Sequence, residues 1–233
     1  MAAMRYAWAV VAAGLVLVMT GCAAQAAPEG DELYRDGEKR YLTMANTMHT
    51  VLMGVHEGVW DVPIGGYGAF PIACDLGHAD DGYRFAYRRS VALSDVDGQA
   101  LSDAAVKAFA DAGLESETAV YGEGDRAEWN VIAEDDAVGR AVVTIRPAEG
   151  TVTASADTPC TPGDSDALSA MVGDDENRGD DILTWRSIPA TEGVDSVPQF
   201  YFPAGGPVYF NEDESPVIPQ PVVTDPPKAP YGS

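Results

Sequence analysis

Five arginines are the residues whose type and placement best suit binding chemistry. A guanidinium group binds phosphate, sulfate or carboxylate through two parallel hydrogen bonds. The five lie within or beside segments that alternate between apolar and polar residues: Arg84, Arg88, Arg126, Arg140 and Arg146. If these segments pair as strands, all five side chains point to one face of a sheet. The spacing therefore predicts a site for an anionic ligand, or for an acidic partner segment, on that face.

The same arginines have a second interpretation that the residues leave open. They could pair with carboxylates from Glu128 or from the acidic C-terminal region, or simply keep an exposed sheet face soluble.

Strands with a period of two would position the arginines. In residues 82–93 the apolar side chains occupy odd positions, the pattern of a half-buried strand. Shorter alternating runs separated by Gly, Asp and Pro predict an antiparallel meander: residues 119–121, 127–133, 139–146 and 151–156.

Two helices are expected beside these strands. Apolar residues at three- and four-residue spacing predict a helix over 31–55. A second helix is expected over 103–112, with Ser102 as its N-cap, Gly113 as its stop, and Val106, Phe109 and Ala110 facing inward. The sequence thus predicts an α+β fold in which one antiparallel sheet of about four to five strands carries two helices on one face, followed by an irregular Pro-rich C-terminal region.

Enzyme and metal-site motifs do not emerge from the chain. It contains no Gly-x-Ser-x-Gly elbow, His-Glu-x-x-His helix or phosphate-binding glycine loop. His49 and His56 are two helical turns apart, about 10 Å along the axis, which is too far to hold one ion together. We therefore expect no metal and no cofactor.

The first 22 residues carry an export pattern. Arg5 precedes an uncharged run that is too short for a free-standing membrane span but fits a secretory signal. The sequence Met19-Thr20-Gly21-Cys22 resembles the lipobox of bacterial lipoprotein precursors, with Met in place of the usual Leu. That resemblance implies that Cys22 is lipidated and that the chain is cut before it, which would anchor the protein to the extracytoplasmic face of the cell membrane.

The pairing of the other two cysteines follows from this assignment. With Cys22 lipidated, Cys74 and Cys160 remain as one pair in an oxidising compartment, which predicts a disulfide. A zinc site is the alternative, but neither cysteine has Cys or His partners nearby.

Charge and composition limit the kinds of partner that the protein can bind. The chain has 14 basic and 37 acidic residues and a net charge of −23. This balance excludes nucleic acid as a partner and argues against charge-driven binding to anionic lipid.

Eleven of the 16 prolines fall between Pro162 and Pro230. We expect a signal peptide over 1–21, a lipid-anchored linker over 22–31, an α+β domain over 32–160, an irregular acidic, partly packed segment over 161–215, and a disordered Pro-rich tail over 216–233.

The function that these features favour is a membrane-anchored, non-catalytic binding or interaction module of the cell envelope. Its partners would be the membrane, through the lipid, and an envelope ligand or protein whose identity the sequence does not reveal. Two alternatives stay open: an envelope hydrolase whose site has no recognisable motif, and a structural spacer.

Overall fold

A computed structural model describes residues 26–63, 68–77, 81–172, 184–187, 191–200, 208–211, 213 and 215–219. The predicted signal peptide and Cys22 lie outside this range. No described helix combines the length and apolarity that a membrane span requires. The elements run in the order α1 (Gly30–Val55), β1 (Trp60–Asp61), β2 (Pro71–Cys74), β3 (Gly82–Ala92), α2 (Gly98–Asp111), β4 (Ser116–Tyr121), η1 (Gly124–Arg126), β5 (Glu128–Asp135), β6 (Gly139–Arg146), η2 (Pro147–Glu149), β7 (Thr151–Asp157), β8 (Thr161–Pro162), α3 (Ser165–Val172), β9 (Thr184–Ser187), β10 (Thr191–Glu192) and β11 (Val208–Asn211).

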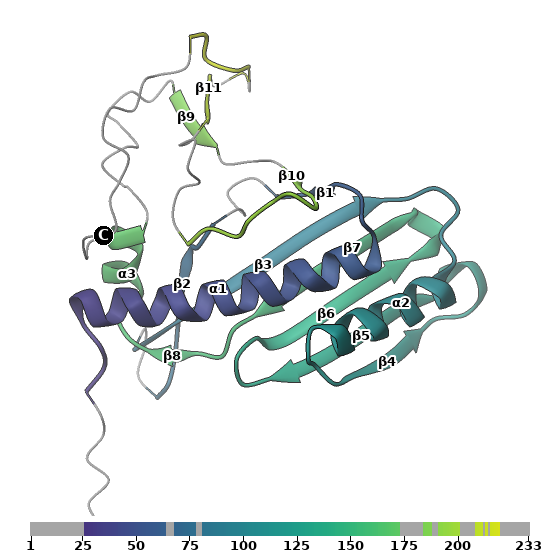
Figure 1. Cartoon of the computed structure of the whole chain (residues 1–233), viewed down its shortest axis with the longest axis horizontal. Helices are drawn as coiled ribbons and strands as arrows, with labels where there is room; N and C mark the ends of the chain where they lie inside the picture. Colours follow the sequence, from purple (N-terminus) through teal and green to yellow (C-terminus); the bar gives the residue numbers. More distant parts are fainter. Residues whose placement is uncertain are drawn as a thin grey trace, which may run out of the picture.

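One antiparallel sheet forms the framework, and α1 and α2 lie side by side on one of its faces (Figure 1). The five longest strands follow the order β3-β7-β6-β5-β4. Strand β3 pairs β2 and β8 along its first half and β7 and β1 along its second half. The α+β class is therefore confirmed.

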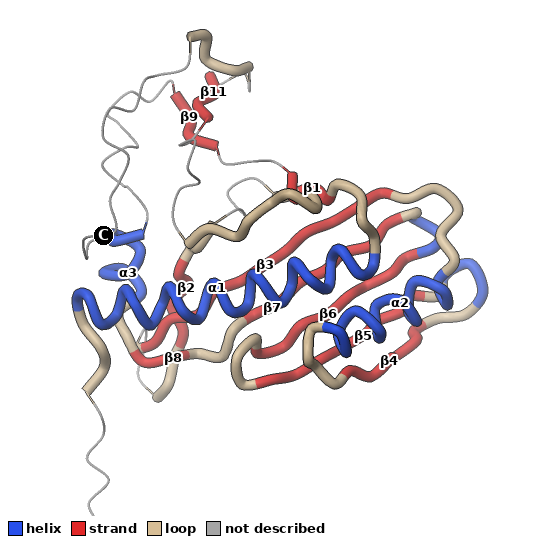
Figure 2. Tube along the Cα trace, viewed as in Figure 1, coloured by secondary structure: helices blue, strands red, loops and turns tan. Residues whose placement is uncertain are grey.

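The predicted number of strands is wrong. The sheet has nine strands rather than four or five, because β1, β2, β8 and β10 add to the five long ones. Each of these four strands has only two to four residues, which is too short for period-two alternation to show in the sequence. Strands β9 and β11 form a separate two-stranded sheet (Figure 2).

Helix α2 begins earlier than predicted. Its N-cap is Asp97, whose carboxylate accepts a hydrogen bond from the backbone N–H of Ala100, so Ser102 lies inside the helix. The carboxylate satisfies an N–H of the first turn, and the residues that follow continue the helix. The buried residues of α2 are Gly98, Ser102, Ala105, Ala108 and Phe109, whereas Val106 and Ala110 are exposed.

The hydrophobic core lies between the helices and the sheet. Helix α1 contributes the predicted apolar stripe, which includes Tyr41, Met44 and Met48. Phe200 is also buried there, and its ring packs edge-on against Tyr34. The C-terminal segment over 191–200 therefore belongs to the folded domain.

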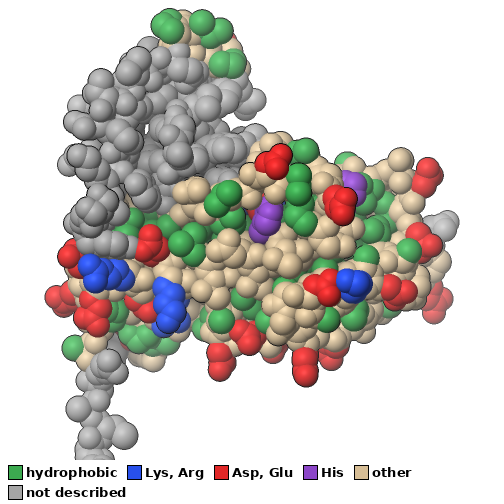
Figure 3. Space-filling model, viewed as in Figure 1, with side chains coloured by type: hydrophobic (Ala, Val, Ile, Leu, Met, Phe, Trp, Pro, Cys, Tyr) green, Lys and Arg blue, Asp and Glu red, His purple; other side chains and the backbone are tan. Residues whose placement is uncertain are grey.

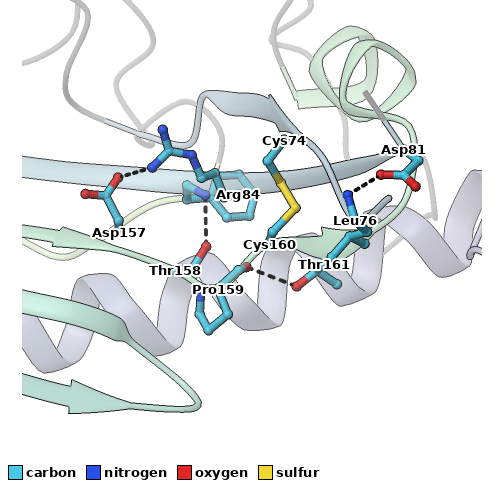
Figure 4. Close-up of a disulfide and its surroundings, with 10 residues drawn as sticks. Cys74, Leu76, Asp81, Arg84, Asp157, Thr158, Pro159, Cys160 and Thr161 are labelled. Carbon is cyan, nitrogen blue, oxygen red and sulfur yellow. Dashed lines mark hydrogen bonds and ion pairs between the residues drawn. A yellow bond between two sulfur atoms is a disulfide. The ribbon is translucent and has the colours of Figure 1, made fainter. Parts of the chain in front are cut away.

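A disulfide joins Cys74 to Cys160, as predicted (Figure 4). Cys74 lies opposite Gly82 of β3, and Gly82 also pairs with Pro162 of β8. A Cβ atom at position 82 would lie 2.7 Å from the Cys160 sulfur and 2.9 Å from the Thr161 carbonyl oxygen. The disulfide therefore crosses β3 where the strand has no side chain.

This crossing makes Gly82→Ala destabilising. The added methyl group has to displace a backbone oxygen and a cross-linked sulfur, so we expect a loss of about 1–3 kcal/mol in the free energy of unfolding. Denaturant unfolding measures it. Gly113→Ala is an informative comparison, because a Cβ there has open space and meets only the strain of a positive φ. Equal stability of Gly82→Ala and the unchanged chain would contradict the close approach.

Candidate functional site

The face of the sheet opposite α1 and α2 is the one that the arginine pattern predicts. We call it the open face and define it by the outward positions of the long strands, in order β3, β7, β6 and β5: Arg84, Ala86, Arg88, Ser90, Thr151, Thr153, Ser155, Asp157, Arg140, Val142, Thr144, Arg146, Glu128, Asn130, Ile132 and Glu134. The alternate positions are buried, among them Val131, Val143 and Val152. The predicted strand parity is correct.

Three of the five predicted arginines form ion pairs with neighbours on this face. Arg84 lies 2.8 Å from Asp157, Arg140 lies 3.7 Å from Glu134, and Arg146 lies 2.6 Å from Glu128. The pair between Arg146 and Glu128 is the pairing that the second interpretation names. These guanidinium groups are thus partly satisfied by the protein itself.

The ion pair of Arg146 continues into a polar network across β6 and β5. Asn130 donates a hydrogen bond to the second oxygen of Glu128, and the Thr144 hydroxyl donates to Asn130. The hydrogen bond from Asn130, and then that from Arg146, hold the pKa of Glu128 below its usual range although partial burial acts in the opposite direction. The network keeps this part of the open face in one arrangement.

The five arginines are spread along the sheet rather than gathered at one point. Arg140 and Arg146 are six residues apart on β6, which corresponds to about 20 Å along a strand. Arg126 lies in η1, before β5 begins. Arg88 lies near the middle of β3, opposite Ser155 and two positions from Ser90. Within the described residues Arg88 and Arg126 are both exposed and form no ion pair, but only Arg88 lies on a strand of the sheet, which makes it the arginine best placed to meet a ligand on the open face.

A buried charged cluster lies on the opposite face, and its members were not among the predicted site residues. Arg89 follows Arg88 and therefore points into the core, where its side chain is 2% exposed. It donates a hydrogen bond of 2.6 Å to Glu192 of β10. The same carboxylate accepts from the Tyr87 hydroxyl at 2.8 Å and contacts His49 Nδ1 at 2.7 Å. Position 89 is one of the odd-numbered, core-facing positions of residues 82–93, and this alternation could have revealed the buried arginine.

The cluster fastens the C-terminal segment to the domain. Its carboxylate comes from β10, the arginine and tyrosine from β3, and the histidine from α1. Burial raises the pKa of Tyr87, so its hydroxyl stays a hydrogen-bond donor at neutral pH. His49 is partly buried against Glu192, and we assign the cluster a structural role.

A groove of about 750 Å³ lies between residues 26–28, the start of α1 and β8. Its charged walls contain three acids and three bases: Asp31, Glu32, Asp36, Arg35, Lys39 and Arg40. Asp36 accepts hydrogen bonds from Arg40 and from the Tyr83 hydroxyl, at 2.7 and 2.6 Å. Burial alone would raise the pKa of Asp36, but these two hydrogen bonds lower it below its ordinary value of 3.8.

The lowered pKa makes Asp36 a source of acid sensitivity. Its carboxylate stabilises the fold at any pH above the pKa that Asp36 has in the unfolded chain. This contribution is lost as the pH falls through the lower pKa that Asp36 has in the folded protein. We expect the melting temperature to drop below about pH 5, and Asp36→Asn to start lower at pH 7 but to fall less steeply. Glu32→Gln, in the same groove but exposed, is the control. Parallel curves for Asp36→Asn and the unchanged chain would contradict this assignment.

No group of three or more His, Cys, Asp or Glu side chains that could hold a metal ion occurs in the described part of the chain.

Comparisons with known proteins add little. No protein-family model and no curated protein matches the chain. Among solved structures, it is similar to a DUF4853 family protein from Actinomyces odontolyticus, with 13% identity over 54% of this chain and 68% of the other, and a TM-score of 0.38. A similarity of that size carries no argument about function.

Proposed function

We propose that this chain is a membrane-anchored extracytoplasmic lipoprotein that acts as a non-catalytic binding module. Its contact surface is the open face, and Arg88 is the point at which an anionic group binds. The observation that carries the proposal is the layering of the fold. Both α1 and α2 lie on one face of the sheet, and no described helix or strand covers the other (Figure 1).

The side chains around Arg88 suit an anion. Ser155 lies directly across from Arg88, and Ser90 follows it on the same face of β3. Cross-strand neighbours have Cβ atoms about 5 Å apart. A guanidinium flanked by two hydroxyls can donate several hydrogen bonds to one phosphate, sulfate or carboxylate.

The ion pairs of two other arginines on the open face support this choice. Arg84 is held by Asp157, and Arg146 is held by Glu128. An anion that binds at Arg88 therefore does not need to displace a carboxylate from it.

Thermal melting with inorganic phosphate, sulfate, glucuronate and a short acidic peptide tests the binding site. A ligand at 100 times its dissociation constant stabilises a protein by about 2.7 kcal/mol. We expect at least one probe to raise the melting temperature of the chain, and Arg88→Gln to abolish that shift.

Lys107→Gln is the matched control, because it removes the same charge from α2 on the other face of the sheet. A shift that Arg88→Gln retains, or that both variants lose equally, would refute a site at Arg88.

Anchoring depends on Cys22. At most about 28 Å of extended chain separates it from the start of α1, so the domain would lie close to the membrane. We expect Cys22→Ala to move the protein from the membrane fraction to the soluble fraction, and the N-terminal peptide of the unchanged chain to begin at Cys22 with the mass of added acyl groups. A Cys22→Ala chain that stays in the membrane would contradict the lipoprotein assignment.

A further inference from the structure

The two edges of the sheet differ in how the chain covers them. At one edge β10 pairs with β1 through Trp60 and Asp61, so the C-terminal segment covers that side. At the other edge β4 pairs with β5 on its inner side (Figure 2). No described segment pairs with the outer side of β4, which leaves an edge of six residues open.

This open edge lacks three of the features that can protect an edge strand, namely proline, lysine and a bulge, and the charges that it carries are acidic. Half of the N–H and C=O groups of such a strand point outward and can pair with another chain. Proline, lysine and bulges normally prevent this pairing. The sequence of β4, Ser-Glu-Thr-Ala-Val-Tyr, contains no proline or lysine, and its pairing with β5 runs without a bulge. Val120 and Tyr121 are 47% and 59% exposed.

The charges along this edge indicate the kind of partner. Glu115 and Glu117 lie at the start of β4, Glu123 follows its end, and all three are exposed. They form no ion pair within the described part of the chain. Acidic side chains line the lower rim in Figure 3, which is the rim that β4 and the turn between β5 and β6 form in Figure 1.

A second copy of this chain is a poor partner for the edge. Pairing two β4 strands would bring the glutamates of both copies together, and each copy carries a net charge of −23. Like charges placed opposite each other destabilise a strand pair. The acidic edge therefore disfavours self-association and favours a basic strand.

We propose that β4 is a docking edge, to which an extended basic segment of a partner protein adds as a further strand. Backbone hydrogen bonds supply the binding, as in other cases of strand addition. Glu115, Glu117 and Glu123 select for lysine or arginine, and Val120 and Tyr121 provide apolar contacts. This edge is distinct from the anion site at Arg88, so either proposal can fail while the other holds.

A synthetic decapeptide of alternating lysine and valine, titrated against the chain as isolated from the expressing cell in mild detergent, tests the edge. Hydrogen exchange measured with and without the peptide should show added protection at 116–121. The same peptide with alternate backbone nitrogens methylated keeps its charge but loses its outward N–H groups. We expect it to bind at least about tenfold more weakly, a difference of 1.4 kcal/mol or more.

Glu117→Lys should lower the affinity of the chain for the lysine peptide by a similar factor. Asp195→Lys, which makes the same charge change in the turn after β10, should change its affinity much less. Equal binding of the methylated peptide, or protection that spares β4, would overturn strand addition. Dimerisation of the unchanged chain through β4, detected by sedimentation, would overturn the choice of a basic partner.

Discussion

Replacing Glu192 by glutamine is expected to lower the free energy of unfolding by about 3–5 kcal/mol, the cost of breaking a buried ion pair by removing one partner. Glu192 and Arg89 are 3% and 2% exposed. The substitution leaves the guanidinium in the core without the carboxylate charge that offsets its desolvation. The same carboxylate also accepts from Tyr87. Denaturant unfolding at neutral pH measures the loss.

Two further variants separate burial from charge pairing. Asp157→Asn weakens the exposed pair with Arg84, whose side chains are 39% and 50% exposed, and should cost less than about 1 kcal/mol. Replacing Arg89 and Glu192 together by methionine removes both charges and should recover much of the loss, because an apolar pair of similar volume often substitutes for a buried ion pair. A Glu192→Gln chain as stable as the unchanged one would show that Glu192 does not hold the C-terminal segment.

Removing the disulfide is the second change with a large expected effect. Cys74 and Cys160 are 86 residues apart, and closing a loop of that length stabilises the folded state by about 4–5 kcal/mol in the chain-entropy model. We expect Cys74→Ala/Cys160→Ala to lose most of this stability. Reductant should have the same effect on the unchanged chain and none on the double variant.

Denaturant unfolding with and without dithiothreitol makes this comparison. Carrying Cys22→Ala in every sample gives lipid-free protein and leaves no third cysteine that could exchange with the disulfide. An unfolding curve of the chain with Cys74 and Cys160 that does not respond to reductant would contradict a stabilising role for the bond.

The alternation of residues 82–93 shows how far sequence reasoning reaches. Period two placed Arg84 and Arg88 on the face opposite the apolar residues, and the structure agrees. The same rule puts Arg89 in the core, although a charged arginine is rarely buried unless a partner pairs with it. Its partner Glu192 lies 103 residues further along the chain, and no local pattern links the two.

The ion pairs of the open face could not be predicted from the sequence for a related reason. Arg84 and Asp157 are 73 residues apart and meet because β3 and β7 are neighbours in the sheet. Strand parity identifies the face but not the row that each residue occupies along it. For that reason the sequence predicts that the arginines share one face but not which carboxylate each of them meets there.

Photo-crosslinking in intact cells tests most directly whether the open face is the contact surface of an anchored protein. A photoreactive amino acid at Ser155, beside Arg88, should link the chain to an envelope component in the membrane fraction. The same group at Lys107 on α2 should not. Crosslinks from Lys107 alone, equal crosslinks from both positions, or none from Ser155 would contradict the proposed function.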